Sequence, residues 1–228
     1  MDKYVLLSYN LNQKIPSYGK RDKFTVNETS QIINGDSANS SSWFFSTNHI
    51  GTHIDMPKHF FNNGKTVTDY PTQKWFFNKI QVVDVPCDRA KLINKKDIKC
   101  EINTNIDLLL IRTGYGKYRL MDKYWNDNPG LSPEFGIWLR DTFRNLRAIG
   151  FDFISLTSWK FRDIGEKAHK IFLDPNGKNS PIWIIEDMNL SSIKNNISGI
   201  IVAPFFVDMS NGSPVTIFAY KQCISNKL

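Results

Sequence analysis

The segment His49-Ile-Gly-Thr-His-Ile-Asp-Met-Pro-Lys-His59 is the most informative stretch of this 228-residue chain. The chain has 4 histidines, and all but one of them fall in this segment, together with Asp55. If the segment is extended, its odd-numbered side chains share one face, because the side-chain period of a strand is two. We therefore expect His49, His53 and Asp55 to point the same way, with Gly51 leaving open space between the two imidazoles.

This pattern of donors suits a metal ion. Neutral imidazole and carboxylate are the usual nitrogen and oxygen ligands of zinc and related ions. Ligation by His49, His53 and Asp55 would leave one coordination position open for water, as a catalytic site requires. Pro57 should end the strand, since it has no N–H to donate, and the turn should carry His59 back as a base beside that position. The alternative is that each histidine is an ordinary surface or hydrogen-bonded core residue, but their spacing favours metal binding.

Length and composition predict a single globular domain over residues 1–228. No apolar run reaches the roughly 18 residues of a membrane span, and the first residues lack the apolar core of a signal peptide. We therefore expect a cytoplasmic protein that does not bind membranes. The net charge of +7 is spread along the chain without a nucleic-acid-binding motif, which indicates a solvated basic surface and no nucleic-acid partner. Cys87, Cys100 and Cys223 are scattered without a CxxC pair, which predicts free thiols.

Short apolar runs and one capped helix define the expected elements. Strands are predicted over 4–9, 43–55, 80–85, 106–111, 151–156, 181–185, 197–203 and 215–220. Ser132 and Pro133 predict the start of a helix, whose apolar positions repeat from Phe135 to Ile149 and which Gly150 should end. A second helix is predicted over 165–173, and residues 10–42 read as a polar connection. This strand-rich order predicts an α/β fold with a mixed sheet rather than regular βαβ alternation.

The segment 49–59 matches every fixed position of the motif HxGTHxDxPxH. In this it resembles the cyclase-like metal-dependent hydrolases, which include bacterial kynurenine formamidase and isatin hydrolase. The resemblance runs from about Tyr4 to Gln222. Further matches are Ile15-Pro16-Ser17-Tyr18, Leu110-Ile-Arg-Thr-Gly114, Gly150-Phe-Asp152 and Ile184-Ile-Glu186. It implies a swivelling β/β/α domain, hydrolysis of a small aromatic amide and a homodimer or higher homo-oligomer.

The resemblance also implies roles for individual residues. His49, His53 and Asp55 would bind one ion, with Asp55 bridging to a second. The second ion would be held by His169 and Glu186, His59 would donate and accept the proton, and Tyr18 would contact the substrate. One or two zinc ions per chain are implied, with manganese as the alternative. Each role has a plainer reading, because His169 could be an exposed helix residue and Tyr18 a loop-packing residue.

Glu186 follows an apolar run, where a buried carboxylate is costly unless it is paired or bound to a metal, so we favour a ligand role. Two departures from the family pattern bear on the site. The turn-rich insertion 173–181 is expected to form a loop near it. Ser155-Leu-Thr157 lacks the carboxylate that is common there, while Asp152 is expected to be structural. Arg112, at a strand end, is expected either to stabilise a carboxylate or to lie on the surface.

Three functions are compatible with these residues. The first is cleavage of a linear aryl amide, with Tyr18, Trp43, Phe60 and Phe61 available to stack on the aryl ring. The second is opening of a cyclic amide such as isatin, or of a lactone, by the same site. The third is a non-catalytic binding protein, which has only the basic charge in its favour.

Overall fold

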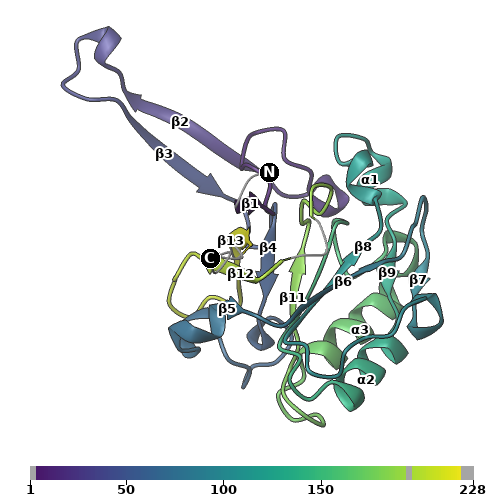
Figure 1. Cartoon of the computed structure of the whole chain (residues 1–228). Helices are drawn as coiled ribbons and strands as arrows, with labels where there is room; N and C mark the ends of the chain where they lie inside the picture. Colours follow the sequence, from purple (N-terminus) through teal and green to yellow (C-terminus); the bar gives the residue numbers. More distant parts are fainter. Residues whose placement is uncertain (1–3, 194–196, 222–228) are drawn as a thin grey trace, which may run out of the picture.

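The computed structural model describes residues 4–193 and 197–221 and contains one large mixed sheet, with helices against one of its faces (Figure 1). The strands are β1 Tyr4–Leu6, β2 Phe24–Ser30, β3 Ser40–Phe45, β4 His53–Asp55, β5 Phe76–Phe77, β6 Ile80–Asp84, β7 Leu92–Ile93, β8 Leu108–Arg112, β9 Gly130–Leu131, β10 Ala148–Phe151, β11 Trp183–Glu186, β12 Gly199–Pro204 and β13 Gly212–Tyr220. The α-helices are α1 Lys123–Asn126, α2 Pro133–Thr142 and α3 Arg162–Leu173. Short 3-10 helices are η1 Tyr18–Lys20, η2 Ile32–Asn34, η3 Pro57–His59, η4 Val67–Asp69, η5 Thr72–Trp75, η6 Lys95–Asp97, η7 Tyr115–Tyr118 and η8 Trp159–Phe161.

The large sheet has two halves of different strand direction. Its order is β5-β12-β13-β4-β11-β10-β8-β6, and β1 also pairs with β13. The strands β6, β8, β10 and β11 run parallel to one another, whereas β4, β13, β12 and β5 pair antiparallel. The short strand β4 joins the two halves, with β11 on one side and β13 on the other.

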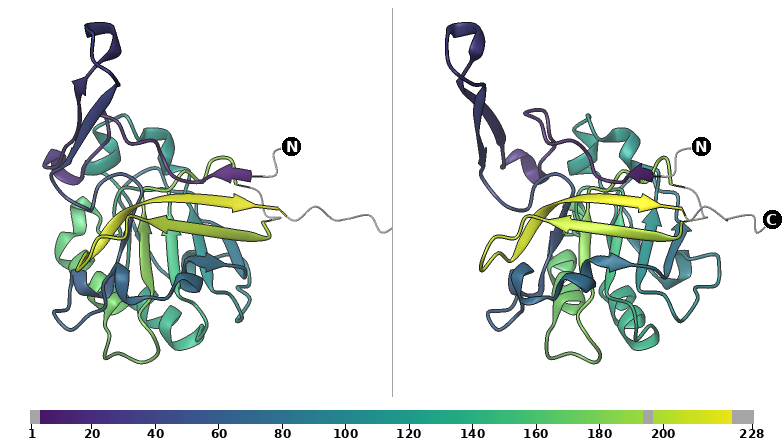
Figure 2. Two further views of the ribbon diagram at one scale, coloured as in Figure 1. Left: turned by 90° about the vertical axis from the view of Figure 1, so that its left-hand side faces the viewer. Right: turned by 60° about the vertical axis from the view of Figure 1, so that its left-hand side comes forward.

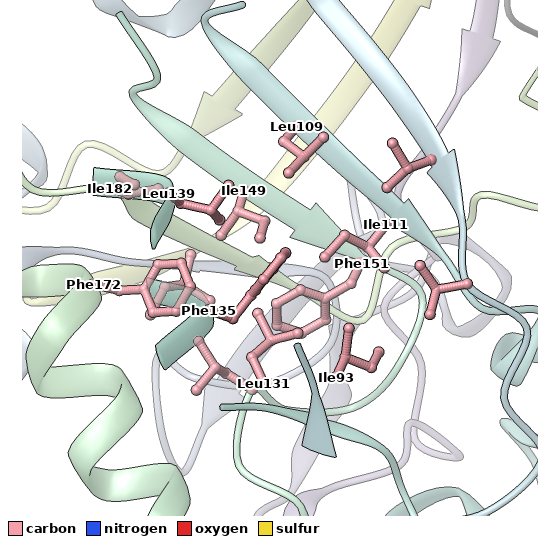
Figure 3. Packing of buried hydrophobic residues seen from close by; sticks show 14 of the residues in the cluster. Ile93, Leu109, Ile111, Leu131, Phe135, Leu139, Ile149, Phe151, Phe172 and Ile182 are labelled. Atoms are coloured by element: carbon pink, nitrogen blue, oxygen red, sulfur yellow. The ribbon is translucent and has the colours of Figure 1, made fainter. Parts of the chain in front are cut away.

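Alternate residues of the parallel strands enter two separate cores, because side chains along a strand point to opposite faces. Leu109, Ile111, Ile149 and Phe151 face α2 and α3 and pack against Phe135, Leu139 and Phe172 (Figure 3). Burial of this many large apolar side chains anchors both helices to that face, since each fully buried side chain contributes roughly 1.5–3 kcal/mol.

The second core lies on the other face of the parallel strands. Leu108, Leu110 and Ile185 pack there with Val202 and Ile217 of the antiparallel half. The long pair β12–β13 crosses that side of the molecule (Figure 2). The layers are therefore sheet, sheet and helix, which confirms the α/β fold with a mixed sheet and the β/β/α arrangement expected from the resemblance.

The helix that begins at Ser132 is shorter than the sequence pattern predicts. The Ser132 hydroxyl accepts a hydrogen bond from the Phe135 N–H at 3.2 Å, as expected of a cap. However, α2 ends at Thr142, and Ile149 and Gly150 belong to β10. The apolar residues beyond Thr142 are buried, but they lie in a turn and in β10. Their helical spacing therefore does not correspond to a helix. The predicted strand over 151–156 is likewise displaced, because β10 covers Ala148–Phe151.

Residues 24–45 form a hairpin that the sequence pattern did not predict. Strands β2 and β3 pair antiparallel and project from the body of the molecule (Figures 1 and 2). The predicted strand over 43–55 is therefore wrong as a single element, since β3 ends at Phe45 and β4 begins at His53. The polar residues of β2 and the serines of β3 concealed the hairpin, because its buried apolar residues are confined to the end near Phe24 and Phe45.

No helix among residues 4–193 and 197–221 is long and apolar enough to cross a membrane. Cys87 is buried and Cys100 exposed, and both are free thiols as predicted. Cys223 lies outside the described residues.

Candidate metal centre

The candidate site is built where β4 meets β11. His53 stands directly opposite Glu186 in the antiparallel register, so their side chains emerge side by side on one face. Asp55, two residues along β4, points the same way and pairs across to Gly212 of β13. His53, Asp55 and Glu186 are all buried, which brings two carboxylates into the interior of the protein.

His49 reaches the site from a loop and not from the strand. Gly51 has a φ of +66°, in the left-handed region that favours glycine, and this breaks the strand before β4. A Cβ on Gly51 would lie 2.6 Å from Ile15 Cδ1, so this glycine allows close packing against Ile15 and does not open space between imidazoles. The expectation that His49 and Gly51 continue the strand is wrong.

The loop nevertheless delivers His49 to Asp55. Its Nδ1 donates to Asp55 Oδ1 at 2.7 Å, and its Nε2 lies 3.0 Å from Asn211 Oδ1. A Cβ on Gly212 would lie 2.5 Å from His49 Cε1, so the absence of a side chain there makes room for the ring. Burial disfavours the charged form of His49, but the adjacent Asp55 outweighs it and raises the pKa of His49 above its usual value.

Two histidines present a free nitrogen to the carboxylates. His53 Nδ1 donates to the Gly51 carbonyl oxygen at 2.8 Å, and His169 Nδ1 donates to the Gly165 carbonyl oxygen at 3.0 Å. In the neutral imidazole, these bonds select the tautomer in which Nε2 carries the lone pair, as metal ligation requires. His169 lies on α3 and is buried, so the alternative interpretation, in which it is an exposed helix residue, is wrong.

Distances among these groups fit a metal ion better than direct hydrogen bonds. His53 Nε2 lies 3.5 Å from both Asp55 Oδ1 and Glu186 Oε2. His169 Nε2 lies 3.6 Å from Asp55 Oδ2 and 3.5 Å from Glu186 Oε1. Such spacings exceed the roughly 2.7–3.2 Å of a hydrogen bond. Bonds of about 2.0–2.2 Å in a tetrahedral site separate ligand atoms by about 3.3–3.6 Å, which is the spacing observed.

Asp55 divides its two oxygens between different histidines. Oδ1 faces His49 and His53, whereas Oδ2 faces His169. The Glu186 carboxylate is held in place, because its Oε1 accepts the Leu156 N–H at 2.7 Å. Ligand atoms of His53, Asp55 and Glu186 lie within 4.8 Å of one another, as do those of His49, Asp55 and His59. The arrangement suits one ion or two that share Asp55.

The electrostatics favour a positive charge at this point. Burial lowers the pKa of His169, but the neighbouring Asp55 and Glu186 outweigh burial and raise it to about 10. Burial opposes ionisation of Asp55, yet His49 and the other imidazoles hold the pKa of that carboxyl well below its usual value. A buried pair of carboxylates thus attracts a cation, whether a proton or a metal ion.

His59 lies over the site on a short helical turn. The 3-10 helix η3 begins at Pro57, and the His59 ring stacks on the His49 ring with centroids 4.0 Å apart. Burial is the largest cause that lowers the pKa of His59, and the nearby imidazoles add to it against the opposing effect of Asp55, which leaves the pKa at about 4. The His59 ring is therefore neutral at pH 7 and can accept a proton.

A cavity of about 730 Å³ opens onto these residues. Tyr18 and Phe60 line it, and the Phe60 ring stacks on His169 with centroids 5.0 Å apart. Trp43 is exposed on the hairpin and Phe61 is absent from the cavity lining, so neither is an aryl-stacking residue of this chain's own site. Lining residues that sequence reasoning missed include Arg21, Ile154 and Arg162.

A buried ion pair beside the candidate ligands was also missed. Asp187, which follows Glu186, has a φ of +52° and is bound by Arg119, whose Nη2 lies 2.7 Å from Asp187 Oδ2. The Thr52 hydroxyl donates to the Asp187 carbonyl oxygen at 2.6 Å, which ties the residue before His53 to the residue after Glu186. The two adjacent acids at the end of an apolar strand were the available sequence signal.

The departures from the family pattern have clear positions. Thr157 lies beside His169, with its Oγ1 at 3.1 Å from Nδ1, so a hydroxyl stands where a carboxylate is common. Residues 173–181 do not line the cavity, and the loop is bound to α2 by Arg140, which donates to the Asp174 and Asn179 carbonyl oxygens. The expectation that this insertion borders the site is therefore wrong.

Two further residues have structural roles. Asp152 accepts hydrogen bonds from the N–H groups of Thr113 and Gly114, both at 2.8 Å, as its structural reading predicts. Arg112 pairs with Asp84 of the neighbouring strand at 2.5 Å, so it does stabilise a carboxylate, although Asp84 lies outside the cavity lining.

Several proteins are similar to this chain in sequence or in fold. A kynurenine formamidase of Bacillus mycoides (strain KBAB4) is 26% identical over 213 residues, which span 93% of this chain and 94% of that protein. Isatin hydrolase A from Labrenzia aggregata, solved with benzyl benzoate, has a TM-score of 0.77 at 20% identity and covers 96% of this chain and 93% of that one. A predicted metal-dependent hydrolase from Bacillus stearothermophilus has a TM-score of 0.76 at 17% identity, over 96% and 98% of the two chains.

The similarity to these solved structures is a similarity of fold. Membership of a protein family is shown by a match to a family model. The model described as "Putative cyclase" matches residues 5–157, which is more than half of the chain and includes the segment 49–59. The chain belongs to this cyclase family.

Proposed function

We propose that this protein is a metal-dependent amidohydrolase that cleaves the C–N bond of a small aromatic amide, in the manner of an arylformamidase. The observation that carries the proposal is the arrangement of His53, His169, Asp55 and Glu186. The Nε2 atom of each histidine lies 3.5–3.6 Å from an oxygen of both carboxylates, as the ligands of one metal ion would. The kynurenine formamidase relatives, one of which matches nearly the full length of the chain, support this choice of bond.

We propose one or two zinc ions per chain, with manganese as the alternative. His53, Asp55, His169 and Glu186 would hold the metal, and His49 would join them on Asp55 Oδ1. An ion bound there would polarise the carbonyl oxygen of the amide and lower the pKa of a water ligand. The hydrogen bonds to Gly51 and Gly165 keep His53 and His169 oriented for ligation.

His59 has the proton-transfer role. Its neutral ring accepts a proton as the attacking water adds to the amide carbon. Once protonated, the ring can give that proton to the leaving amine nitrogen, and its lowered pKa favours this transfer. Phe60 and Tyr18 line the cavity and would place the aryl ring. The Tyr18 hydroxyl stays protonated, because burial and then the charge of Glu186 raise its pKa to about 12.

Elemental analysis combined with turnover tests the proposal. The metal-loaded protein should hydrolyse N-formylkynurenine or formanilide. His59→Asn should lower kcat by about 10²–10⁴-fold, the usual contribution of a general acid–base, while retaining the metal content. Absence of turnover with the metal fully loaded would reject an arylformamidase.

A cyclic amide is the second candidate, since an isatin hydrolase is similar in fold over nearly the whole chain. The same ligands and the same base would serve ring opening, because the amide bond is of the same kind. A panel of linear formamides beside isatin and aromatic lactones separates the two, and the higher kcat/KM identifies the class of substrate.

We further propose that the protein is a homodimer. The hairpin β2–β3 exposes Trp43 and Phe44, whose side chains find no core on their own chain. Exposed aromatic residues on a projecting element are typical of a protein–protein contact. Sedimentation of the purified protein measures its oligomeric state, and a monomer at micromolar concentration would contradict this assembly.

A further inference from the structure

The acid that follows Glu186 lies beside the candidate metal ligands but is not one of them. Asp187 lines the same cavity as His53, Asp55 and Glu186, and it is only 2% exposed. Its oxygens belong to neither of the two groups of ligand atoms that lie within 4.8 Å of one another among the described residues. Carboxylate oxygen is a usual ligand of zinc and of manganese, so the exclusion of this third acid requires a physical cause.

The backbone explains why two adjacent acids border one cavity. Along a regular strand, the side chain after Glu186 would point to the opposite face of the sheet. The strand β11 ends at Glu186, and the φ of +52° at Asp187 interrupts the extended backbone there. Consecutive Cα atoms are only about 3.8 Å apart. Both carboxylates can therefore compete for one cation in this cavity.

Both oxygens of Asp187 are occupied by other side chains. Arg119 Nε donates to Oδ1 at 2.9 Å and Nη2 donates to Oδ2 at 2.7 Å, and the Tyr124 hydroxyl also donates to Oδ1. Two parallel N–H bonds from one guanidinium group make a strong, directional pair. Burial, and then the charge of Asp187, raises the pKa of Tyr124 well above its usual value, so its hydroxyl stays a donor.

Arg119 is itself fixed in place. It is 8% exposed, and its guanidinium group lies over the Tyr9 ring, with Cζ 3.9 Å from the centroid. The Tyr9 N–H donates to Thr52 Oγ1 at 2.9 Å, and the Thr52 hydroxyl donates to the Asp187 carbonyl oxygen at 2.6 Å. The ion pair therefore belongs to a network that includes the residue before His53.

A contribution to stability is a weak explanation for this pair. The desolvation of two buried charges offsets most of their attraction, and apolar residues of similar volume often stabilise a protein as well or better. A buried ion pair that lines the cavity of the candidate metal centre is better explained by an effect on that centre.

We infer that Arg119 is a positioning residue of the metal centre, which holds the Asp187 carboxylate away from the metal ion. Glu186 is then the only acid at this end of β11 that binds the ion, and one coordination position remains open for water, as a catalytic metal requires. The inference rests on the proposed function for the presence of the ion. Arg119 acts through Asp187 and touches neither the metal nor the substrate.

The test uses the sign of a change in metal affinity. Arg119→Gln removes the cation and leaves Asp187 free to bind the ion, so zinc affinity should rise at least about tenfold, since opposite charges a few ångströms apart attract strongly in a buried site. In the cobalt-substituted protein the visible absorption should change, because it reports coordination geometry. Disturbed packing alone would weaken zinc binding. An unchanged or lower affinity in Arg119→Gln would therefore overturn the inference.

A double variant identifies the acid responsible. Arg119→Gln combined with Asp187→Asn removes both charges, and the asparagine can still accept from Tyr124. Zinc affinity and the cobalt spectrum should return to those of the unaltered protein, whereas tightened binding that persists would mean that another group has become the ligand. Arg119→Lys keeps the charge and should stay close to the unaltered protein. If Arg119→Gln does not fold, Tyr124→Phe removes one donor to Asp187 and should raise zinc affinity by a smaller factor.

Arg140→Gln is the matched control. Arg140 is also buried, at 5% exposed, but it does not line the cavity, and its donors bind carbonyl oxygens of Ile171, Asp174 and Asn179. Its removal changes the net charge by the same amount. This variant should lose stability and keep the zinc affinity and the cobalt spectrum of the unaltered protein. An equal rise in zinc affinity here would show a general effect of charge and overturn the inference.

These measurements separate the inference from the proposed function, because zinc titration and cobalt spectra require no turnover. A protein that hydrolyses formanilide but shows no gain of zinc affinity in Arg119→Gln would overturn the inference and leave the arylformamidase standing. Tightened zinc binding in a protein that hydrolyses none of the amides would sustain the role of Arg119 and reject only the arylformamidase. A protein that binds neither zinc nor manganese would overturn both.

Discussion

Two regions of the molecule, the hairpin β2–β3 and the strand pair β4–β11, reverse the usual distribution of polar and apolar residues. Trp43 and Phe44 of the hairpin are 62% and 60% exposed, whereas Asp55 and Glu186 are 2% and 3% exposed. Apolar exposure and carboxylate burial both cost free energy relative to the opposite arrangement. We propose that each region is completed by something that the single chain does not contain, a partner surface for the hairpin and a cation for the strand pair.

Metal binding should distinguish the two regions most strongly. An ion present at about a thousand times its Kd stabilises the folded state by about 4 kcal/mol, which corresponds to about 8–16 °C in Tm for a chain of this size. Hydrogen exchange should slow in β4 and β11 and stay unchanged in β2–β3. Glu186→Gln should remove most of the Tm shift. An equal shift in that variant would mean that the ion binds elsewhere.

Gly165→Ala should show how tightly the site depends on its supporting packing. Alanine in place of a helical glycine normally stabilises a protein by up to about 1 kcal/mol. Here the added Cβ would lie 2.4 Å from Thr157 Oγ1, so we expect a destabilisation of about 1–3 kcal/mol instead.

The readout beyond stability is metal affinity. Because His169 donates to the Gly165 carbonyl oxygen, displacement of this turn should weaken metal affinity by about tenfold, the low end of the effects seen when a ligand's hydrogen-bond partner is disturbed. Lys167→Ala, at an exposed position of the same helix, is the control for changes in helix propensity and should leave metal affinity unaltered. Isothermal titration with zinc and chemical denaturation measure the two quantities, and a stabilised variant with normal affinity would contradict the packing described.

Substitutions in the hairpin should have the smallest effect on the folded chain. The double variant Trp43→Ser and Phe44→Ser should change the free energy of unfolding of the monomer by no more than about 0.5 kcal/mol, as for exposed residues in general. If the hairpin holds the proposed dimer, the same variant should raise the dimer dissociation constant at least tenfold. Glu28→Gln, an exposed polar change on the same hairpin, is the control. A loss of several kcal/mol in the monomer would show that the aromatic pair belongs to a core after all.

The sequence by itself was sufficient to select candidate ligands among the residues that are costly to bury. The segment 49–59 and Glu186 stand out in the amino-acid sequence, because imidazole and carboxylate groups in and beside apolar strands are rarely placed there by chance, whereas His169 was identified only from the family resemblance. The Ser132 cap and the core strands were equally readable, since the cap depends on local hydrogen bonding and strands buried on both faces appear as continuous apolar runs. The fold brings these candidate ligands together in one cavity wall.

Only the tertiary structure decided how these residues meet. The left-handed turn at Gly51 breaks the predicted strand, and His49 reaches Asp55 only because Gly212, far along the chain, has no side chain. The ends of α2 and β10 were misplaced because residues beyond Thr142 are buried by packing and not by helical periodicity. Tyr18 contacts Trp159, although the two are far apart in the sequence. Local sequence patterns report short-range preference, whereas contacts between distant segments depend on the whole fold.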